Sequence, residues 1–256
     1  MKIATWNVNS IRTRLERALA WIQAHDPDVL CLQEIKCEDE IFPREPFEAL
    51  GYHVETHGQK TYNGVALLSK TPAEDVVRGL PGDGDDAQAR FIAGTFDGLR
   101  VIDVYVPNGS SVDSDKFVYK LDWLSRLGEA IDDAHGPDDD VLLVGDFNIA
   151  PDGRDVYDPE AFAGQVHFHP KEHAALAALT EWGFEDLFRK FEDGPGWYSW
   201  WDYRQLGFPK NKGLRIDLML GTSSVWDHCD ECWIDRDERK GEKPSDHAPV
   251  VADIDW

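Results

Sequence analysis

The stretch VLLVGDFN at residues 141–148 constrains the fold of this chain more than any other. Its first four residues form an uninterrupted apolar run, which predicts a strand buried in the core of a sheet. A glycine ends the run, and Asp146 and Asn148 follow where the strand opens into a loop. Because residues two apart on a strand share a face, we expect these two side chains to project together.

A carboxylate and an amide at such a place can handle a water molecule, a metal ion or a phosphate oxygen. An Asx-type turn that caps the strand is the ordinary explanation of the same two residues and, taken alone, the better one. The rest of the chain therefore has to decide between a catalytic and a structural role for this pair.

Apolar patterns elsewhere predict a mixture of helices and strands. Helices are expected near residues 13–25, 116–134 and 171–182, and further strands near 2–8, 29–32, 64–69, 90–96, 99–106, 197–203, 215–220, 229–234 and 248–254. Neither a linker rich in Pro, Gly or Ser nor a clear repeat divides the 256 residues. We therefore expect one domain, residues 1–256, with a mixed-sheet core and outer helices.

The charge balance restricts the kinds of partner. The chain has 26 basic and 49 acidic residues, a formal net charge of −23. As a bulk property this argues against non-specific binding to nucleic acid, because counterion release needs basic side chains, but it allows a local basic groove. No apolar run approaches membrane-spanning length and the N-terminus reads as a strand rather than a signal peptide, so we expect a cytoplasmic protein without membrane contact.

Polar residues stand at the ends of several predicted strands. Asn7 follows the first strand, Glu34 follows the second, and Tyr105 lies late in another. Each has an ordinary structural explanation: a strand-end carboxylate for Glu34 and core packing for Tyr105. The functional interpretation depends on the joint pattern.

One acidic residue lies inside an apolar run. Asp217 is in the stretch LRIDLML at 214–220, and a buried carboxylate without a partner is costly. Asp246 and His247 precede the last predicted strand. We predict that Asp217 pairs with His247, because a carboxylate orients an imidazole and raises its pKa. A satisfied core histidine is the structural alternative for His247.

Six short motifs follow one another along the chain: TWNVNS at 5–10, LQEIK at 32–36, YNGVA at 62–66, GDFN at 145–148, GLRID at 213–217 and PSDHAP at 244–249. Together and in this order they resemble the exonuclease III family of the endonuclease/exonuclease/phosphatase superfamily. The resemblance implies a deoxyribonuclease I-like α/β fold, a four-layer sandwich of two packed mixed β-sheets flanked by helices, with the site at one end of the sheets.

The resemblance also implies an activity, that of a hydrolase of base-excision repair. The family carries out Mg²⁺-dependent phosphodiester hydrolysis on duplex DNA, as 3′→5′ exonuclease and as abasic-site endonuclease. The implied partner is double-stranded DNA with abasic sites, nicks or 3′ ends, bound by a monomer. Glu34 would be the main metal carboxylate, with Asn7 nearby and Asp246 in the outer shell of the metal. Hard oxygen ligands suit Mg²⁺, and Mn²⁺ should substitute; one and two metal ions are both compatible with these residues.

Catalytic roles carry over to five further positions. Asp146 would orient or deprotonate the attacking water, helped by Asn148. His247, held by Asp217, would donate to a non-bridging phosphate oxygen and stabilise the charge of the transition state. Tyr105 would contact the phosphate or assist the leaving oxygen.

Contacts to DNA are expected from basic and aromatic residues. The basic residues predicted to track a DNA backbone are Arg12, Lys116, Lys210, Lys212 and Arg215. Arg14, Arg17 and Lys120 lie in the same segments, and surface charge is the better explanation of Arg17 and Lys120. By the resemblance, Trp200, Leu214 and Ile216 wall a pocket for a flipped sugar, whereas Trp201 is expected in the core.

His167 departs from the smaller residue that we expect at this place in many members of the family. An imidazole there would obstruct a sugar flipped from continuous duplex more than a terminal 3′ nucleotide, which predicts strong 3′-end trimming and weaker abasic incision. A ring turned outward without effect is an equal alternative. Two other functions stay open at this point: a superfamily enzyme for a non-DNA phosphate ester, and a DNA-binding protein without catalysis.

Overall fold

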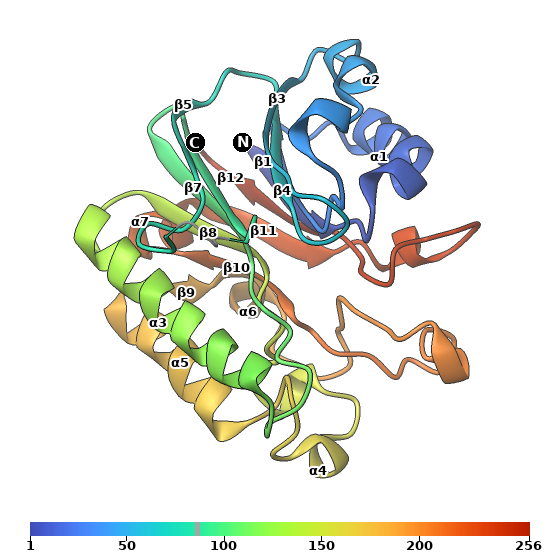
Figure 1. Ribbon diagram of the computed structural model, residues 1–256, viewed down its shortest axis with the longest axis vertical. Coiled ribbons are helices and arrows are strands. Elements are labelled where there is room, and N and C mark those ends of the chain that lie inside the picture. The colour runs from blue at the N-terminus through green and yellow to red at the C-terminus, as the bar shows by residue number, and fades with distance from the viewer. Residues whose placement is uncertain (85–87) are drawn as a thin grey trace.

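The computed structural model describes residues 1–84 and 88–256, in which two six-stranded sheets pack face to face (Figure 1). The first sheet has the order β11-β12-β1-β2-β4-β3. Its strands are β1 (Lys2–Asn7), β2 (Val29–Gln33), β3 (His53–His57), β4 (Val65–Ser69), β11 (Cys229–Ile234) and β12 (Val250–Ile254). The second sheet has the order β5-β6-β7-β8-β10-β9. Its strands are β5 (Glu74–Arg78), β6 (Phe91–Phe96), β7 (Leu99–Tyr105), β8 (Val141–Asp146), β9 (Glu185–Asp186) and β10 (Asp217–Gly221).

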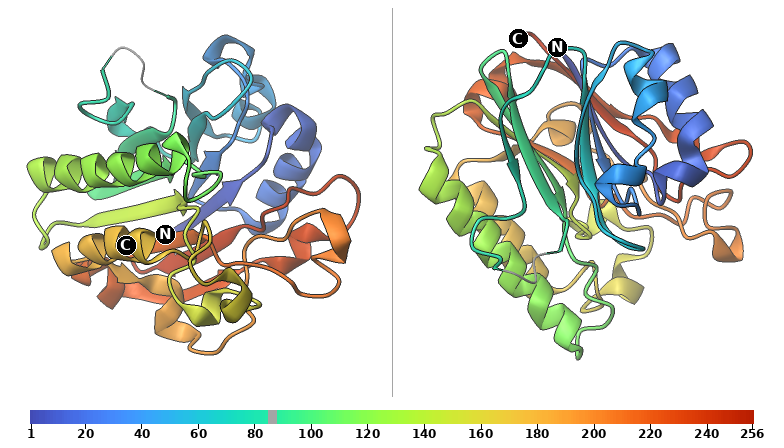
Figure 2. Two further views of the ribbon diagram at one scale, coloured as in Figure 1. Left: turned by 60° about the horizontal axis from the view of Figure 1, so that its bottom comes forward. Right: turned by 45° about the horizontal axis from the view of Figure 1, so that its top comes forward.

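Helices cover the outer face of each sheet (Figure 2). On the first sheet lie α1 (Ile11–His25) and α2 (Arg44–Glu48), and on the second α3 (Asp115–Ala134) and α5 (Pro170–Trp182). Shorter pieces complete the chain: α4 (Pro159–Phe162), α6 (Leu187–Phe191), α7 (Ser223–His228) and the 3₁₀ turns η1 (Asp39–Ile41), η2 (Gly153–Asp155), η3 (Arg204–Leu206) and η4 (Arg236–Arg239). The layers confirm the predicted four-layer α/β sandwich. Across the described residues, no helix is both long and apolar enough to cross a membrane.

The position of the central strand β8 accounts for its apolar sequence. Leu142 and Val144 lie in the apolar layer between the two sheets, whereas Val141 and Leu143 lie in the layer beneath α3 and α5. A strand covered on both faces needs apolar side chains at every position rather than at alternate ones. The continuous run at 141–144 is therefore the expected sequence of a central strand in a sandwich.

The pairing of the strands brings their functional ends to one edge. β2 runs parallel to β1, and β8 runs parallel to β7, so the carboxyl ends of each pair lie at the same edge of their sheet. β12 is antiparallel to β1 and β10 is antiparallel to β8, which puts the starts of β12 and β10 at that edge too. The register places Asp146 opposite both Tyr105 and Asp217.

Two predicted strands differ from the structure, and some observed strands have no counterpart among the predictions. Residues 197–203 form no strand but make isolated bridges, Trp200 to Leu214 and to His247, because the segment bonds to two separate loops instead of one ladder. The strand predicted at 215–220 begins at Asp217, since the backbone N–H of Arg215 bonds to Asp155. Strands β3 and β5 went unpredicted because their sequences, HVETH and EDVVR, carry little apolar signal.

Candidate active site

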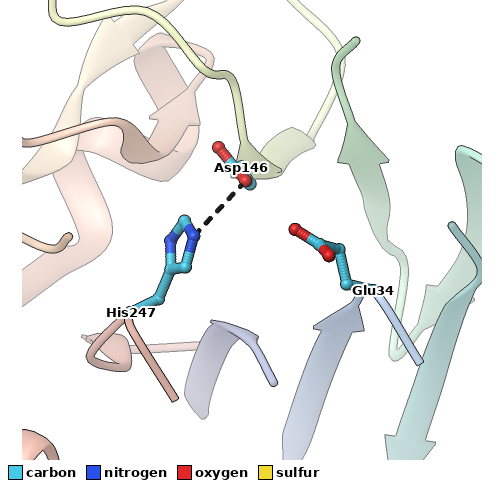
Figure 3. A group of neighbouring side chains, drawn as sticks. All are labelled: Glu34, Asp146 and His247. Carbon is cyan, nitrogen blue, oxygen red and sulfur yellow. Dashed lines mark ion pairs between the residues drawn. The ribbon is translucent and has the colours of Figure 1, made fainter. Parts of the chain in front are cut away.

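Three ligand-type side chains converge where the strand ends meet. Single ligand atoms of Glu34, Asp146 and His247 all lie within 4.8 Å of one another, in a geometry that could hold a metal ion. Figure 3 shows them pointing toward one another from the end of β2, the end of β8 and the loop before β12. The register of the sheets, rather than nearness in sequence, brings them together.

Asn7 bridges the two carboxylates of this cluster. Its side-chain Nδ2 donates to Glu34 Oε1 at 2.8 Å and to Asp146 Oδ2 at 2.9 Å. Its Oδ1, the atom that would bind a metal, accepts the backbone N–H of Asn9 at 3.0 Å. In this arrangement Asn7 therefore orients the two carboxylates and does not offer its oxygen to the cluster.

A cation already faces Glu34 within the protein. Lys36 Nζ lies 2.7 Å from Glu34 Oε2 and donates to Asn9 Oδ1 at 2.5 Å. Burial, the largest single influence, favours the neutral form of Glu34. The charge and hydrogen bond of Lys36, the hydrogen bond of Asn7 and the charge of His247 together outweigh burial and place the pKa of Glu34 below its ordinary value. Asp246 is linked to this pair through Asn9. Its carboxylate accepts hydrogen bonds from Asn9 Nδ2 at 2.9 Å and from Trp200 Nε1 at 3.1 Å.

His247 and Asp217 form the predicted pair. His247 Nδ1 lies 2.8 Å from Asp217 Oδ2, and both side chains are almost fully buried. Burial alone would lower the pKa of His247, but the carboxylates of Asp217 and Asp146 raise it to about 10. The imidazole is therefore charged at neutral pH, with Nε2 carrying a proton 3.8 Å from Asp146 Oδ2.

Asp146 is held by a turn of its own. The backbone N–H of Asn148 donates to Asp146 Oδ1 at 2.9 Å, with Asn148 in the left-handed region at φ 52°. Burial raises the pKa of Asp146 to about 7, although the nearby charge of His247 opposes that rise. The Asx-type turn and the catalytic role of Asp146 are therefore compatible, because the turn orients the Asp146 carboxylate toward the cluster.

Tyr105 connects the cluster to a neighbouring cavity. Burial and the charges of Glu34 and Asp146 raise the pKa of Tyr105 well above its ordinary value, so its hydroxyl keeps its proton. The guanidinium of Arg90 lies 4.7 Å above the Tyr105 ring. Both line a cavity of about 450 Å³, whose rim includes the exposed Lys116.

Four of the predicted basic DNA contacts lie at the surface. Arg12, Lys116, Lys210 and Lys212 are exposed. Lys212 Nζ lies 5.6 Å from the centre of the Tyr157 ring and lines a cavity that it shares with Trp200.

The prediction that Arg215 contacts the DNA backbone is wrong. Arg215 is 1% exposed and bonded to Asp155 and Asp186, so it is a buried structural cation that cannot reach a DNA backbone. Lys120 is also no surface charge, because it is 0% exposed. Arg14 donates to Asn9, Tyr203 and Pro244, and Arg17 pairs with Glu238.

The residues predicted to wall the sugar pocket pack together. Leu214 and Ile216 form a small apolar cluster with Ala150 and Val156, and Trp200 packs against it. Trp201 is fully buried, as predicted. The Trp200 side chain bonds Asp246, which places the apolar cluster directly beside the acidic one.

The ring of His167 is turned inward. Its Nδ1 lies 2.6 Å from the backbone oxygen of Asn148, and its own carbonyl accepts the N–H of Ala150. The ring is therefore hydrogen-bonded to the loop that follows β8, and the residue is half-buried. This orientation differs from a ring turned out into solvent, and the effect of the ring on the substrate stays a prediction.

Sequence reasoning missed four residues that hold the site. Ser199 Oγ accepts the backbone N–H of Asp217, and Ser245 Oγ accepts that of His247; both serines are fully buried. Asn9 links Asp246 to Lys36, and Asn108 donates to Asn148 Oδ1. Ser245 and Asn9 lie inside two of the six motifs, which is a signal that the sequence offers. Ser199 lies in the segment predicted as a strand, where nothing marks it, and Asn108 lies in a loop without a pattern.

Comparison with known proteins agrees with this geometry. The sequence matches the Endonuclease/Exonuclease/phosphatase family over residues 4–247. The exodeoxyribonuclease III of Haemophilus influenzae is 40% identical over 266 residues, which cover 99% of this chain and 100% of that protein.

Solved structures of similar proteins share the whole fold. A 3′ phosphatase from Neisseria, NExo, solved with a product DNA hairpin, is 41% identical with a TM-score of 0.96, and an AP endonuclease from Archaeoglobus fulgidus is 39% identical with a TM-score of 0.96; each match covers 100% of both chains. With the six motifs in order and their side chains gathered at one edge of the sandwich, this chain belongs to the endonuclease/exonuclease/phosphatase family, among the relatives of exodeoxyribonuclease III.

Proposed function

We propose that the protein is a Mg²⁺-dependent DNA phosphodiesterase of base-excision repair. It trims 3′ ends of duplex DNA as a 3′→5′ exonuclease and cuts at abasic sites more weakly. The observation that carries this proposal is the cluster of Glu34, Asp146 and His247 beside the apolar cluster at Trp200. The names of the relatives, an exodeoxyribonuclease III, a 3′ phosphatase and an AP endonuclease, support it.

The chemistry follows from the protonation states of the buried groups. Asp146 accepts the proton of the attacking water, and the N–H of Asn148 keeps its carboxylate aimed. His247, charged and oriented by Asp217, donates from Nε2 to a non-bridging phosphate oxygen. Tyr105 keeps its proton and can hydrogen-bond the phosphate or the leaving oxygen.

The donor set fits a hard divalent cation. One or two carboxylates with several retained waters are typical of Mg²⁺ sites, and Mn²⁺ suits the same oxygens. Here the carboxylates of Glu34 and Asp146 accept from the same Asn7 amide. Glu34 would hold the ion through its carboxylate, one oxygen of which faces Lys36 in this structure. When bound, such an ion supplies charge neutralisation for the phosphate and its leaving group.

Substrate class is tested with the unmodified enzyme. We expect Mg²⁺-dependent cleavage of labelled duplexes with recessed or nicked 3′ ends, weaker cleavage of an abasic duplex, and slow turnover of a small phosphodiester such as bis(p-nitrophenyl) phosphate. Faster turnover of the small ester would favour a non-DNA substrate. Binding of duplex DNA without cleavage would instead indicate a binding protein.

We predict that Glu34→Gln raises the Mg²⁺ concentration needed for half-maximal activity by at least roughly 100-fold. Loss of a group that only supports a metal ligand costs about 10–100-fold in affinity, and Glu34 is placed as a ligand itself. Glu181→Gln, a change at an exposed residue of α5, is the matched control. An unchanged Mg²⁺ requirement in Glu34→Gln would remove Glu34 from the metal site.

The preference for 3′ ends is assigned to His167. A sugar flipped from continuous duplex has strand on both sides, whereas a terminal nucleotide is tethered on one side and can avoid the inward-facing ring. We predict that His167→Gly raises abasic incision relative to 3′-end trimming. Glycine suits this position, since His167 has φ 74°, so the fold should tolerate the change.

The measurement is the ratio of the two initial rates on an abasic duplex and on a recessed 3′ end. Melting temperatures of both proteins serve as the control for folding. A ratio that stays at the value of the unmodified enzyme would show that the imidazole does not select the substrate.

A further inference from the structure

A buried ion pair lies behind the loop that carries Asn148, and the mechanism above makes no use of it. Lys120 on α3 and Glu172 on α5 are both 0% exposed, and the Lys120 ammonium bonds Glu172 Oε1. The two helices lie side by side on the second sheet (Figure 1). Desolvation of two charges is costly, and an apolar pair of similar volume is often as stable. Packing alone therefore does not account for this pair.

The other protons of Lys120 go to two functional loops. Nζ donates to the backbone oxygen of Asn148 at 2.7 Å and to that of Asn108 at 3.3 Å. Asn148 belongs to the loop after β8 and Asn108 to the loop after β7. One buried ammonium thus fixes both loops that leave the central parallel strands at the site.

The same two residues bond the two ring nitrogens of His167. Nδ1 lies 2.6 Å from the Asn148 oxygen, and because a carbonyl only accepts, Nδ1 carries the proton. Nε2 lies 3.4 Å from Asn108 Nδ2, which donates to it. Both partners of the imidazole are therefore partners of Lys120 as well.

Glu172 holds the chain on the other side of His167. Its Oε2 accepts the backbone N–H of His169 at 3.1 Å, in the capping box that starts α5. His167 itself has the positive φ of 74°, a strained backbone for a residue with a side chain. Such a conformation persists when its surroundings over-determine it. Here the contacts that constrain His167 involve the Lys120–Glu172 pair, because Lys120 bonds the same Asn148 oxygen as the ring and Glu172 bonds the N–H of His169.

We propose that Lys120, paired with Glu172, is a positioning residue that fixes the ring of His167 and thereby sets the preference between 3′ ends and internal abasic sites. This inference rests on the proposed function, in which His167 selects the substrate. Lys120 touches no substrate and acts through the carbonyl of Asn148 and the loop of Asn108.

The electrostatics agree with the hydrogen bonds. Burial and then the charge of Lys120 lower the pKa of His167 to about 3, so the ring is neutral at working pH. A charged ring would present a second N–H to the Asn108 amide donor and lose that contact. His247 opposes a charge on His167 in the same sense, more weakly than Lys120.

The test replaces the ion pair without losing the helix cap. The variant Lys120→Met with Glu172→Gln removes both charges and keeps a side-chain oxygen for the N–H of His169. Arg17→Met with Glu238→Gln removes a different ion pair and is the matched control. Lys120→Gln, one atom shorter and uncharged, is the milder variant should the double change impair folding.

The first readout is the imidazole of His167, observed by NMR with ¹⁵N-labelled histidine. In the unmodified enzyme we expect a neutral ring protonated at Nδ1 that does not titrate between about pH 5 and 8. In both Lys120 variants we expect this fixed tautomer to be lost and the ring to titrate nearer the ordinary value of about 6.5. An unchanged His167 spectrum in a folded Lys120 variant overturns the proposal.

The second readout is the ratio of abasic incision to 3′-end trimming. We expect the Lys120→Met, Glu172→Gln variant to raise this ratio ~10- to 100-fold, since a displacement of about 1 Å can change a rate by that much. The effect should vanish when His167 is already glycine, because Lys120 would then have no ring to position. An equal rise in the His167→Gly background would assign the effect to general loosening and overturn the proposal.

The two hypotheses fail in different ways. If His167→Gly leaves the ratio unchanged, the substrate selection attributed to His167 is wrong, and the spectrum still tests whether Lys120 positions the ring. If His167→Gly changes the ratio but the His167 spectrum is the same in the Lys120 variants as in the unmodified enzyme, only the positioning role of Lys120 is wrong.

Discussion

Replacement of Asp146 by asparagine will lower kcat by several orders of magnitude while DNA binding is largely retained. Positioned proton transfer contributes about 10²–10⁴-fold to a rate, and an amide cannot accept the proton of the attacking water. The turn that aims residue 146 should survive, because an asparagine oxygen can still accept the N–H of Asn148. The measurement is single-turnover cleavage of a recessed duplex, with binding followed separately by fluorescence anisotropy.

Asp138→Asn provides the matched control, since Asp138 is exposed and lies before β8, away from the end that carries Asp146. It should leave the rate unchanged. A variant of Asp146 that cleaves within about tenfold of the unmodified enzyme would exclude proton transfer by this residue.

The same group should govern the pH profile. The pKa of Asp146 is raised to about 7 by burial, and only the ionised carboxylate can accept a proton. The rate should therefore fall as the pH drops through this value. A bound cation favours the ionised form, so the midpoint of the profile should move to lower pH as the Mg²⁺ concentration rises. If the midpoint of the pH profile stays the same at all Mg²⁺ concentrations, Asp146 does not lie close enough to the bound ion to be affected by its charge.

The second large effect concerns the pair of His247 and Asp217. His247→Ala removes a charged donor that is already oriented toward the phosphate, and such losses cost about 10²–10³-fold in kcat. Asp217→Asn should also lower the rate sharply, because the amide no longer raises the pKa of His247 or holds its ring.

The double variant distinguishes a shared role from two separate ones. If Asp217 acts through His247, the combined change should cost far less than the product of the single changes, as residues that work as a unit are not additive. Full multiplication of the two effects would make Asp217 a purely structural carboxylate. Circular dichroism of all three variants controls for loss of fold.

Local sequence patterns were enough to predict the fold class and much of the site. Strands and helices express a local periodicity, so β8 and α3 were predictable from their own residues. Asp217 was recognisable because a carboxylate within an apolar strand needs a partner, and the predicted partner, His247, lies 2.8 Å away. Such a prediction is possible when the residues around a charged side chain already show that it will be buried.

Which basic residues are exposed and how the ring of His167 is oriented could be read only from contacts between distant segments. Lys212 and Arg215 look alike in sequence, yet Lys212 is exposed and Arg215 is buried on Asp155, 60 residues earlier in the chain. His167 faces inward because Asn148 accepts its ring proton. Both outcomes depend on partners that the fold brings from distant segments, and no local pattern of charge or hydropathy encodes them.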